Sequence, residues 1–480
     1  MKNQKKVLTG LLLSVVPFSV HFCTQEKQGK PNVLFILVDD LRPNLGCYGD
    51  TLSFTPNIDQ LANRGVVFTR AYCQQAVCNP SRASLLTGLR PDEIGVYDLV
   101  THFRDKVPDV ITLPQIFKNN GYHTFGIGKV FHAKPETLDP ISWSEPGPIY
   151  EVGNYLLPEN QIGTGKQNVT EAADVNDTAY IDGKIANDAI HYLEKAKASG
   201  QSFFLAVGFK KPHSPYCAPK KYWEIYKKTQ FEVTNRDKPI GSPDIAFHKW
   251  EEIRGYRDIP KTGEISLEKE QEIWHGYYAC ISYVDAQVGR ILEILDKLDL
   301  SKNTIIVLWG DHGYHLGEQQ LWCKATNFEL DARVPLIISA PGMKKNGSKS
   351  EAIVETLDIY PTLIDLCKIQ PQGKLSGVSL RPLLKNPDKK WKNVSYNQFI
   401  RPWPLGKMSP THMGYSVRTE EWRCTFWFDF KSGSIEDKEL YHLIGNSIEM
   451  KNLAGEPEYS NIEAKLARLI DDYKNGKYIK

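Results

Sequence analysis

The segment Cys78-Asn79-Pro80-Ser81-Arg82 holds the residues whose types and spacing best suit chemistry. Pro80 suits the first turn of a helix, because it has no N–H to leave unpaired and its φ is already set. Asn79 is expected to cap that helix. Cys78 then lies at the positive end of the helix dipole, and Arg82, about one turn later, can offer two parallel N–H groups to an oxyanion. The segment therefore predicts an anion-handling site around a cysteine.

The other interpretation of Cys78 is a buried structural thiol where a loop meets a helix, which is how free cysteines usually occur. The chain has nine cysteines and no Cys-x-x-Cys pair, so neither a zinc knuckle nor a dense disulfide scaffold is expected. An odd number of cysteines also leaves room for one chemically special thiol.

Polar side chains follow four of the expected strands, directly after each strand ends. The pairs of strand and polar cluster are Val33 to Val38 with Asp39 and Asp40, Thr124 to Ile127 with Lys129 and His132, Phe203 to Val207 with Lys211 and His213, and Ile305 to Trp309 with Asp311 and His312. In an open α/β sheet, ligands bind in the crevice outside the carboxyl ends of the strands. We therefore expect these clusters to meet in one pocket.

Three of these side chains, Asp39, Asp40 and Asp311, carry the hard oxygen ligands that calcium or magnesium prefers. Taken singly, an aspartate after a strand often only closes a turn. Taken together, three carboxylates in one pocket repel one another unless a cation holds them. The sequence therefore predicts a divalent cation beside Cys78.

Alternation of short apolar runs with helical patterns predicts an α/β fold, with a large, mixed, mostly parallel sheet covered by helices. A fifth strand is expected at Leu336 to Ser339, and an amphipathic helix from Leu267 to Leu300. The polar stretches 150–177 and 231–263 are expected to be long loops near the mouth of the site.

Beyond Pro371-Gln372-Gly373 the pattern changes to antiparallel strands within 393–400, 414–418 and 424–430, followed by a last helix. We therefore expect a catalytic domain at 31–370 and a smaller C-terminal subdomain of antiparallel sheet plus helix at 371–480.

The net charge and the N-terminal residues limit which classes of protein the chain can belong to. With 480 residues and a net charge of +2, the chain does not have the basic excess of a nucleic-acid binder. Three lysines precede the apolar stretch Val7 to Val20, which Pro17 interrupts and which is too short for a membrane span. Residues 1–23 are expected to be an export signal, and Cys23 is a candidate for the lipid-bearing cysteine of a lipoprotein. We expect an exported protein, in the periplasm or on the outer membrane of a bacterium.

From Pro31 to the final helix the chain resembles the sulfatase family, and most closely its iduronate-2-sulfatase branch. The runs that carry the resemblance are Asp39-Asp40-Leu41-Arg42, Cys78-Asn79-Pro80-Ser81-Arg82, Gly128-Lys129-Val130-Phe131-His132, Lys211-Pro212-His213, Gly310-Asp311-His312-Gly313, Leu321-Trp322-Cys323-Lys324 and Met413-Gly414-Tyr415-Ser416-Val417-Arg418-Thr419. The resemblance implies an alkaline-phosphatase-like fold.

The resemblance to the sulfatase family also implies a modified nucleophile and a metal ion. Cys78 would be oxidised to formylglycine by a formylglycine-generating enzyme or an anaerobic sulfatase-maturating enzyme. One calcium ion would be bound by Asp39, Asp40, Asp311, His312 and the modified Cys78.

The remaining site residues follow from the same motifs. Arg82 and Lys129 would hold the hydrated aldehyde and its charge, with His132 orienting it. His213 and Lys324 would contact the sulfate and the leaving oxygen. Arg104 and Arg401 are candidates for binding a substrate carboxylate.

The function expected is hydrolysis of the 2-O-sulfate of a uronic acid in heparin, heparan or chondroitin-type fragments. Three alternatives remain open from the sequence. The chain could remove sulfate from another sugar position, or it could hydrolyse phosphonate or phosphate monoesters on the same fold. It could also be a lipoprotein that binds sulfated glycans and in which Cys78 is never converted.

Overall fold

The computed structural model describes residues 29–479, except residues 133, 146, 151–154, 251, 407 and 446. The export signal expected at 1–23, with Cys23, lies outside the described residues. Within the described part, no helix has both the length and the apolar composition needed to cross a membrane.

The centre of the main sheet is made of four parallel strands, and they are those that precede the polar clusters. β1 (Asn32–Val38) lies between β5 (Phe203–Phe209) and β7 (Thr304–Gly310), and β3 (His123–Gly128) pairs with the far side of β5. Every residue of β1, β5 and β7 is buried, as expected for strands that helices cover on both faces. Their carboxyl ends therefore meet at one edge.

The other half of the sheet mixes strand directions. β9 (Leu336–Ser339) runs antiparallel to both β7 and β2 (Val66–Tyr72), while β10 (Ser348–Glu355) is parallel to β2. The short β8 (Arg333–Val334) pairs with β2. The mixed, mostly parallel sheet predicted from the sequence is confirmed, with β2 and β10 as additional strands.

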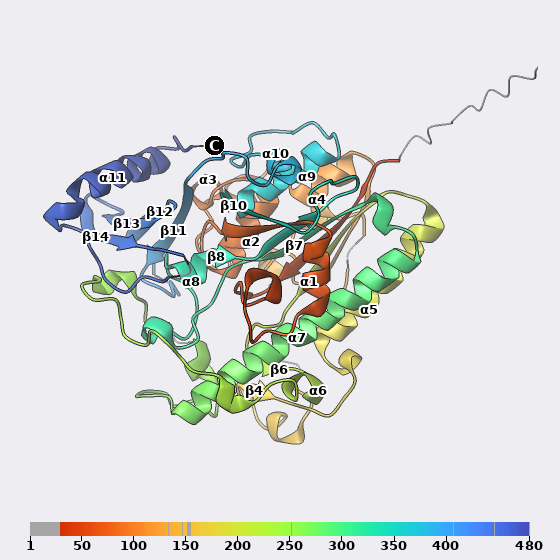
Figure 1. The fold of residues 1–480 in the computed structure, drawn as a ribbon, viewed down its shortest axis with the longest axis horizontal. Helices are drawn as coiled ribbons and strands as arrows, with labels where there is room; N and C mark the ends of the chain where they lie inside the picture. The colour runs from red at the N-terminus through yellow and green to blue at the C-terminus, as the bar shows by residue number, and fades with distance from the viewer. Residues whose placement is uncertain are drawn as a thin grey trace, which may run out of the picture.

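Helices cover both faces of this sheet (Figure 1). Alternate residues of β1 face opposite cores, Leu34 and Ile36 on one side and Val33 and Phe35 on the other. The first core is closed by α1 (Pro56–Asn63), α5 (Ile181–Ser199) and the long α7 (Leu267–Lys297). The second is closed by α2 (Cys78–Thr87), α4 (Leu113–Asn119) and α9 (Ile359–Leu366). The shorter elements are α3 (Pro91–Ile94), α6 (Lys220–Trp223), α8 (Glu329–Ala332), α10 (Arg381–Lys385), β4 (Thr170–Glu171) and β6 (Tyr216–Cys217).

The C-terminal part is a four-stranded antiparallel sheet with one helix against it. Its strands are β11 (Ser395–Arg401), β12 (His412–Arg418), β13 (Trp422–Asp429) and β14 (Ile435–His442), paired in chain order, and α11 (Ser460–Lys474) packs on β12 and β13. The predicted antiparallel sheet with a helix is confirmed, whereas a domain boundary at residue 371 stays a prediction.

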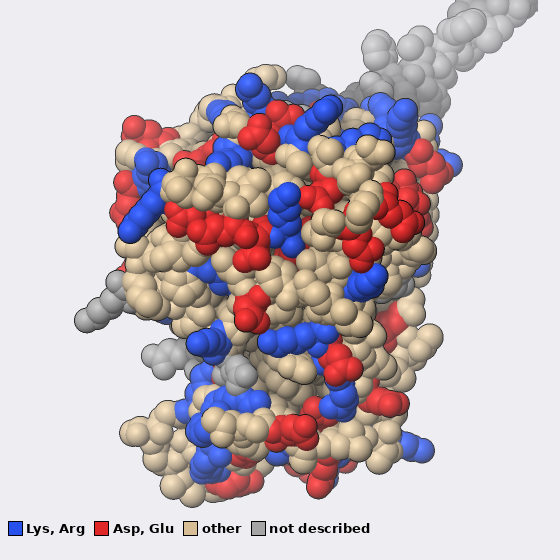
Figure 2. Space-filling model, turned by 90° about the vertical axis from the view of Figure 1, so that its left-hand side faces the viewer, with Lys and Arg blue, Asp and Glu red and all other residues tan. Residues whose placement is uncertain are grey.

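Buried ion pairs join the two parts. Arg418 Nε and Arg423 Nη2 bind Glu329 Oε2 on α8 at 2.9 and 2.7 Å. On the surface, basic and acidic side chains are interspersed on the face in Figure 2, in keeping with the small net charge.

Candidate active site

The helix that carries Cys78 begins at this residue, and Pro80 lies in its first turn, as the sequence predicted. Gly88 ends α2 in the left-handed conformation, with φ of 71°. The cap is different from the one expected: Val77, in extended backbone, precedes the helix, and Asn79 lies inside its first turn. The Asn79 amide instead donates hydrogen bonds to the carbonyls of Asp98 and Thr101, both at 2.9 Å, so it ties α2 to the following loop.

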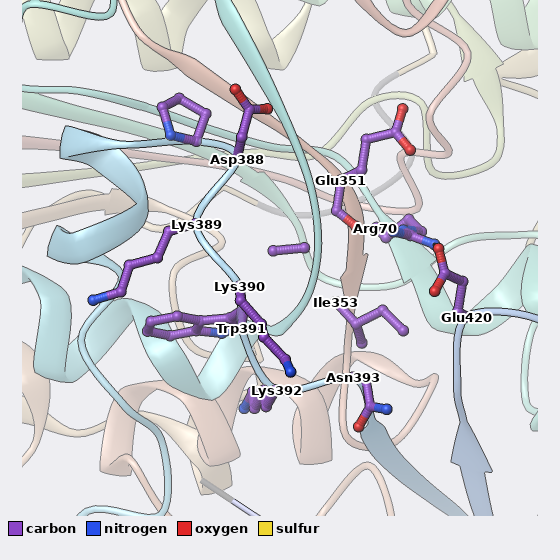
Figure 3. Close-up of a pocket in the computed structure, with 12 residues that line it drawn as sticks. Arg70, Glu351, Ile353, Asp388, Lys389, Lys390, Trp391, Lys392, Asn393 and Glu420 are labelled. Carbon is purple, nitrogen blue, oxygen red and sulfur yellow. Dashed lines mark hydrogen bonds and ion pairs between the residues drawn. The ribbon is translucent and has the colours of Figure 1, made fainter.

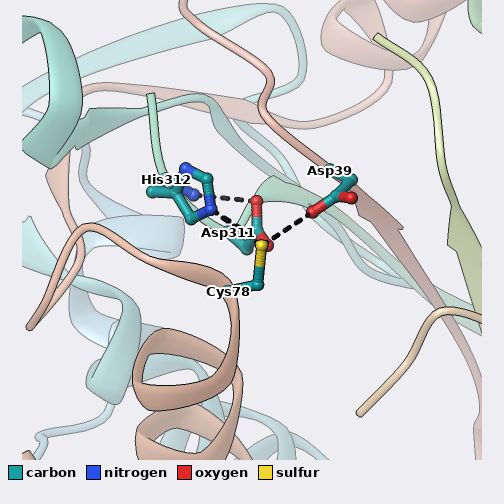
Figure 4. Close-up of side chains that lie close together, drawn as sticks. All are labelled: Asp39, Cys78, Asp311 and His312. Carbon is teal, nitrogen blue, oxygen red and sulfur yellow. Dashed lines mark hydrogen bonds and ion pairs between the residues drawn. The ribbon is translucent and has the colours of Figure 1, made fainter. Parts of the chain in front are cut away.

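The sulfur of Cys78 lies beside His312 and Asp39, as Figure 4 shows, and also beside Lys129. Sγ is 3.2 Å from His312 Nε2, 3.3 Å from Lys129 Nζ and 3.5 Å from Asp39 Oδ1. All four side chains are buried. Cys78 is therefore in a polar, charged pocket rather than in an apolar core.

The order of the strands explains this gathering. Asp39 follows β1, Asp311 follows β7 and Lys129 follows β3, so all three leave the same edge of the sheet. Asp40 adopts a left-handed φ of 57°, and its N–H donates to Asp311 Oδ1 at 3.1 Å. This local turn directs two successive aspartates into the site.

Arg82 fixes two of these carboxylates and is itself fully buried. Its Nε donates to Asp311 Oδ2 at 2.8 Å and its Nη2 to Asp39 Oδ1 at 3.1 Å. Its Nη1 donates to the Lys129 and Val130 carbonyls. With all of these partners in the protein, Arg82 orients the acids and supplies positive charge beside Cys78.

Neighbouring charges at this site shift the pKa values of Asp39 and His312. Burial raises the pKa of Asp39, but the neighbouring Lys129 and Arg82 outweigh it and hold that pKa well below its usual range. Burial lowers the pKa of His312, while Asp311, Cys78 and Asp40 raise it to about 10. Asp39 is therefore ionised, and a positive charge is favoured on His312.

A divalent cation fits this set of donors. One ligand atom each from Asp39, Cys78, Asp311 and His312 lie within 4.8 Å of one another. His312 Nδ1 is 2.9 Å from the Gly313 carbonyl, which leaves Nε2 facing the acids, the arrangement common for metal-binding histidines. Because most donors are carboxylate oxygens, the site suits a hard cation, held by Asp39, Asp40, Asp311 and His312.

The opposite side of the pocket is formed by Lys324, His213 and an unexpected acid, Glu252. Lys324 Nζ lies 3.1 Å from both oxygens of Asp40 and 2.9 Å from Glu252 Oε2. His213 Nε2 is 3.7 Å from Glu252 Oε1, and its Nδ1 is 2.7 Å from the Ser214 carbonyl. Glu252 belongs to the stretch 231–263 that we expected near the site mouth, but nothing in a polar loop singles out this residue.

His132 lies near the same charges without a partner of its own. Neither ring nitrogen has a hydrogen-bond partner among the described residues. Burial lowers the pKa of His132 to about 2, with Lys129 adding to the effect, so the ring is neutral at physiological pH. A neutral, unpartnered imidazole is available to a ligand.

The two arginines considered for a substrate carboxylate already have protein partners. Arg104 binds Asp139 with Nε and Nη2, at 2.6 and 2.8 Å. Arg401 donates only to main-chain carbonyls in the hydrogen bonds of the described residues, and burial lowers its pKa to about 9. One of those carbonyls belongs to Ala325, next to Lys324. Substrate binding by Arg104 and Arg401 stays a prediction.

A separate groove of about 440 Å³ shares no residue with this site (Figure 3). Trp391, Lys389 and Lys390 line one wall, and Arg70 faces Glu420 across 3.7 Å on the other. Acidic and basic side chains are mixed in it. The groove therefore lacks the concentrated positive charge expected of a site for sulfated polymers.

Comparison with known proteins agrees with this geometry. The family model described as sulfatase matches residues 31–369, and that of the N-sulphoglucosamine sulphohydrolase C-terminal region matches 317–476. The chain is 34% identical to human iduronate 2-sulfatase, over 92% of this chain and 95% of the relative.

Two solved structures share the fold at 25% identity. One, determined in complex with its substrate D-glucosamine-2-N,6-O-disulfate, has a TM-score of 0.75 and covers 93% of this chain and 98% of its own. The other, described as a 2-O glycosaminoglycan sulfatase, has a TM-score of 0.69 and covers 94% and 93%. Together with the family match over most of its length, these findings establish that the chain belongs to the sulfatase family.

Proposed function

We propose that this protein hydrolyses the 2-O-sulfate ester of a uronic acid in glycosaminoglycan fragments. The observation that carries the proposal is the position of Cys78, whose sulfur is within 3.5 Å of Lys129, His312 and Asp39 at the start of a buried helix. The 34% identity to human iduronate 2-sulfatase and the fold shared with a 2-O glycosaminoglycan sulfatase support the sugar position.

The nucleophile in this proposal is formylglycine made from Cys78. Formylglycine supplies a geminal hydroxyl that attacks sulfur and an aldehyde that re-forms as sulfate leaves. Lys129 Nζ and the N-terminus of α2 place positive charge beside this position, which favours an anionic side chain there. Arg82 keeps Asp39 and Asp311 oriented toward the same point. A plain thiol has no equivalent route for releasing sulfate.

The leaving oxygen would be met by His213 and Lys324. His213 Nδ1 donates to the Ser214 carbonyl, so Nε2 is the free ring nitrogen, and it would give a proton to the departing sugar oxygen from the doubly protonated imidazolium form. Lys324 Nζ would balance negative charge that develops on that oxygen.

The metal proposed is one calcium ion, held by Asp39, Asp40, Asp311, His312 and the modified Cys78, because carboxylate oxygens dominate the donors. When bound, it lowers the energy of negative charge on oxygen at this position. We further propose that the protein is exported and converted by a formylglycine-generating or anaerobic sulfatase-maturating enzyme, in keeping with the signal-like residues 1–23.

A panel of disaccharides tests the position of the ester. Converted enzyme is assayed on substrates sulfated only at the uronate 2-position, the glucosamine 6-position or the galactosamine 4-position, with an aryl sulfate and an aryl phosphonate alongside. We expect the highest kcat/KM on the uronate 2-sulfate. Preference for either hexosamine sulfate would overturn the uronate assignment, and preference for the phosphonate would overturn the sulfatase assignment.

Arg104→Ala and Arg401→Ala test the substrate carboxylate. The arginine that binds it should lose about 2 to 4 kcal/mol of transition-state stabilisation on the uronate substrate and little on an aryl sulfate. Arg401 also binds main-chain carbonyls of residues 245–247. An equal loss of kcat/KM on both substrates would therefore show that Arg401 positions this loop and does not bind the substrate carboxylate.

A further inference from the structure

We propose that Glu252 is a specificity-determining residue that makes this site favour singly charged sulfate esters over doubly charged phosphate monoesters. The inference rests on the proposed function, because it assigns Lys324 and His213 to the reacting group. The role proposed for Glu252, discrimination between ligands by their charge, is not implied by any of the sequence motifs.

The geometry places a fixed carboxylate directly beside the groups assigned to sulfate. Glu252 Oε2 is 2.9 Å from Lys324 Nζ, and Oε1 is 3.7 Å from His213 Nε2. The Glu252 side chain is 10% exposed and that of Lys324 is 1% exposed, so Glu252 is the more accessible member of this ion pair. A ligand anion that contacts Lys324 and His213 must therefore approach this carboxylate as well.

Contacts other than the Glu252 carboxylate already hold its loop and Lys324. Arg401 binds the carbonyls of residues 245–247, and Lys166 Nζ donates to the Glu252 carbonyl at 3.3 Å. Lys324 is held by Asp40, and its Nζ lies 5.4 Å from the centre of the Trp250 ring. A carboxylate at 252 is thus not needed to fix either element, whereas a negative charge there does change the electrostatics of the pocket.

The balance of charge indicates what the extra carboxylate selects. Around these groups the acids Asp39, Asp40, Asp311 and Glu252 are matched in number by the cations Arg82, Lys129, Lys324 and Lys166, whose Nζ lies 3.8 Å from Glu252 Oε1. Burial raises the pKa of Glu252, but Lys324 and His213 outweigh it and hold that pKa well below its usual range. An ionised Glu252 therefore lowers by one the net positive charge that a divalent cation bound by the other acids would leave at the site.

Repulsion by Glu252 grows with the charge of the ligand. A sulfate ester carries one negative charge, whereas a phosphate monoester with its second pKa of about 6 carries nearly two above neutral pH. Coulomb energy is proportional to charge, so Glu252 penalises the phosphate monoester about twice as strongly as the sulfate ester. A phosphate diester carries one negative charge, so Glu252 repels it about as strongly as it repels a sulfate ester.

The experiment compares Glu252→Gln with Asp244→Asn in the converted, metal-loaded enzyme. Asp244 is an exposed acid on the same loop, so its replacement removes the same charge without a contact to Lys324 in the described structure. Three substrates share one aryl leaving group: a sulfate, a phosphate monoester and a phosphate diester. In Glu252→Gln we expect the monoester-to-sulfate ratio of kcat/KM to rise about tenfold or more. The diester-to-sulfate ratio should stay constant, and Asp244→Asn should change neither ratio.

A binding measurement keeps the test independent of turnover. Inhibition constants are measured for benzenesulfonate, a monoanion, and for phenylphosphonate at about pH 8, where a second ionisation makes it largely a dianion. Glu252→Gln should tighten phenylphosphonate selectively. In the wild type, a lower pH protonates phenylphosphonate and reduces its negative charge. Its affinity relative to that of benzenesulfonate should therefore rise as the pH falls.

Two outcomes overturn the inference. An unchanged monoester-to-sulfate ratio together with unchanged inhibitor selectivity would show that Glu252 does not select by charge. A rise in the diester ratio as large as that of the monoester would assign Glu252 a steric role. A wild type that turns over no sulfate ester contradicts the proposed function instead, and the inhibitor measurement then still decides the role of Glu252.

Discussion

Cys78 Sγ lies 3.2 Å from His312 Nε2, although 234 positions separate them in the chain. Cys78 begins a helix on one face of the sheet, and His312 is the second residue after β7. The contact exists because the carboxyl end of β7 and the start of α2 meet at one edge of the sheet. This edge is where parallel α/β sheets collect their functional groups.

Conversion of Cys78 is the first outcome that can be checked directly. The tryptic peptide 71–82 from active protein should show the mass change expected for a thiol that has lost hydrogen sulfide and gained an oxygen. Cys78→Ala should abolish turnover and leave the thermal unfolding midpoint nearly unchanged, since Sγ has only polar neighbours. Full activity in a preparation whose peptide is entirely thiol would contradict the mechanism.

Removal of the cation should lower both activity and stability. Without a cation, Asp39, Asp40 and Asp311 lose its attraction, and only Arg82, Lys129 and Lys324 offset the mutual repulsion of these buried acids. Chelation should therefore reduce the unfolding midpoint as well as kcat, and calcium should restore both more effectively than magnesium. Exhaustively chelated protein that keeps full activity would mean that these acids serve only the fold.

Site residues could be predicted from the sequence where a short segment around them shows both a strand and the polar residues that follow it. Asp39, Lys129, His213 and Asp311 could be located because each lies within four residues of the end of a parallel strand, and these strands share an edge. Glu252 could not, since it reaches Lys324 from a long loop whose path depends on contacts with Arg401, about 150 residues away in sequence.

The same reasoning applies to the sheets. Fully buried strands such as β5 show as continuous apolar runs, whereas the first half of β14 is mostly exposed and gives no such signal. Strand order is also invisible in the sequence: β1 pairs with strands that begin at residues 203 and 304. These pairings are set by packing of the helices over both faces.

Acid should weaken the loop through His248. Its Nδ1 accepts a hydrogen bond from the Trp250 N–H at 3.1 Å, and burial, with Arg401 nearby, lowers its pKa from 6.5 to about 3. Because the unfolded chain binds this proton more readily, His248 costs the fold stability as the pH falls below 6.5, by about 1.4 kcal/mol per pH unit until its folded pKa is reached.

The measurement is the free energy of unfolding at several pH values for the wild type and His248→Gln. The variant should lose less stability than the wild type between about pH 6.5 and pH 4. Asp244→Asn, on the same loop, should follow the wild type. Parallel curves for the wild type and His248→Gln would show that this histidine is not buried in its neutral form.

Asp331 should be required both for stability and for the position of Lys324. Its Oδ1 lies 2.6 Å from His315 Nδ1, and its Oδ2 accepts hydrogen bonds from the Thr326 N–H and Oγ1 at 3.0 and 2.7 Å. All of these groups are fully buried. Asp331→Ala leaves the buried Nδ1 of His315 and the Thr326 N–H without the Asp331 carboxylate, which should cost about 3 to 5 kcal/mol of stability.

The effect on catalysis follows because Thr326 is two residues from Lys324. Once Thr326 is released, Lys324 should be less well placed against the leaving oxygen, so kcat/KM for an aryl sulfate should fall even well below the unfolding midpoint. Glu293→Ala, which breaks an exposed ion pair with Lys297 on α7, serves as a control and should alter neither quantity measurably. If Asp331→Ala loses stability but keeps full kcat/KM in the folded range, then Asp331 supports the fold without positioning Lys324.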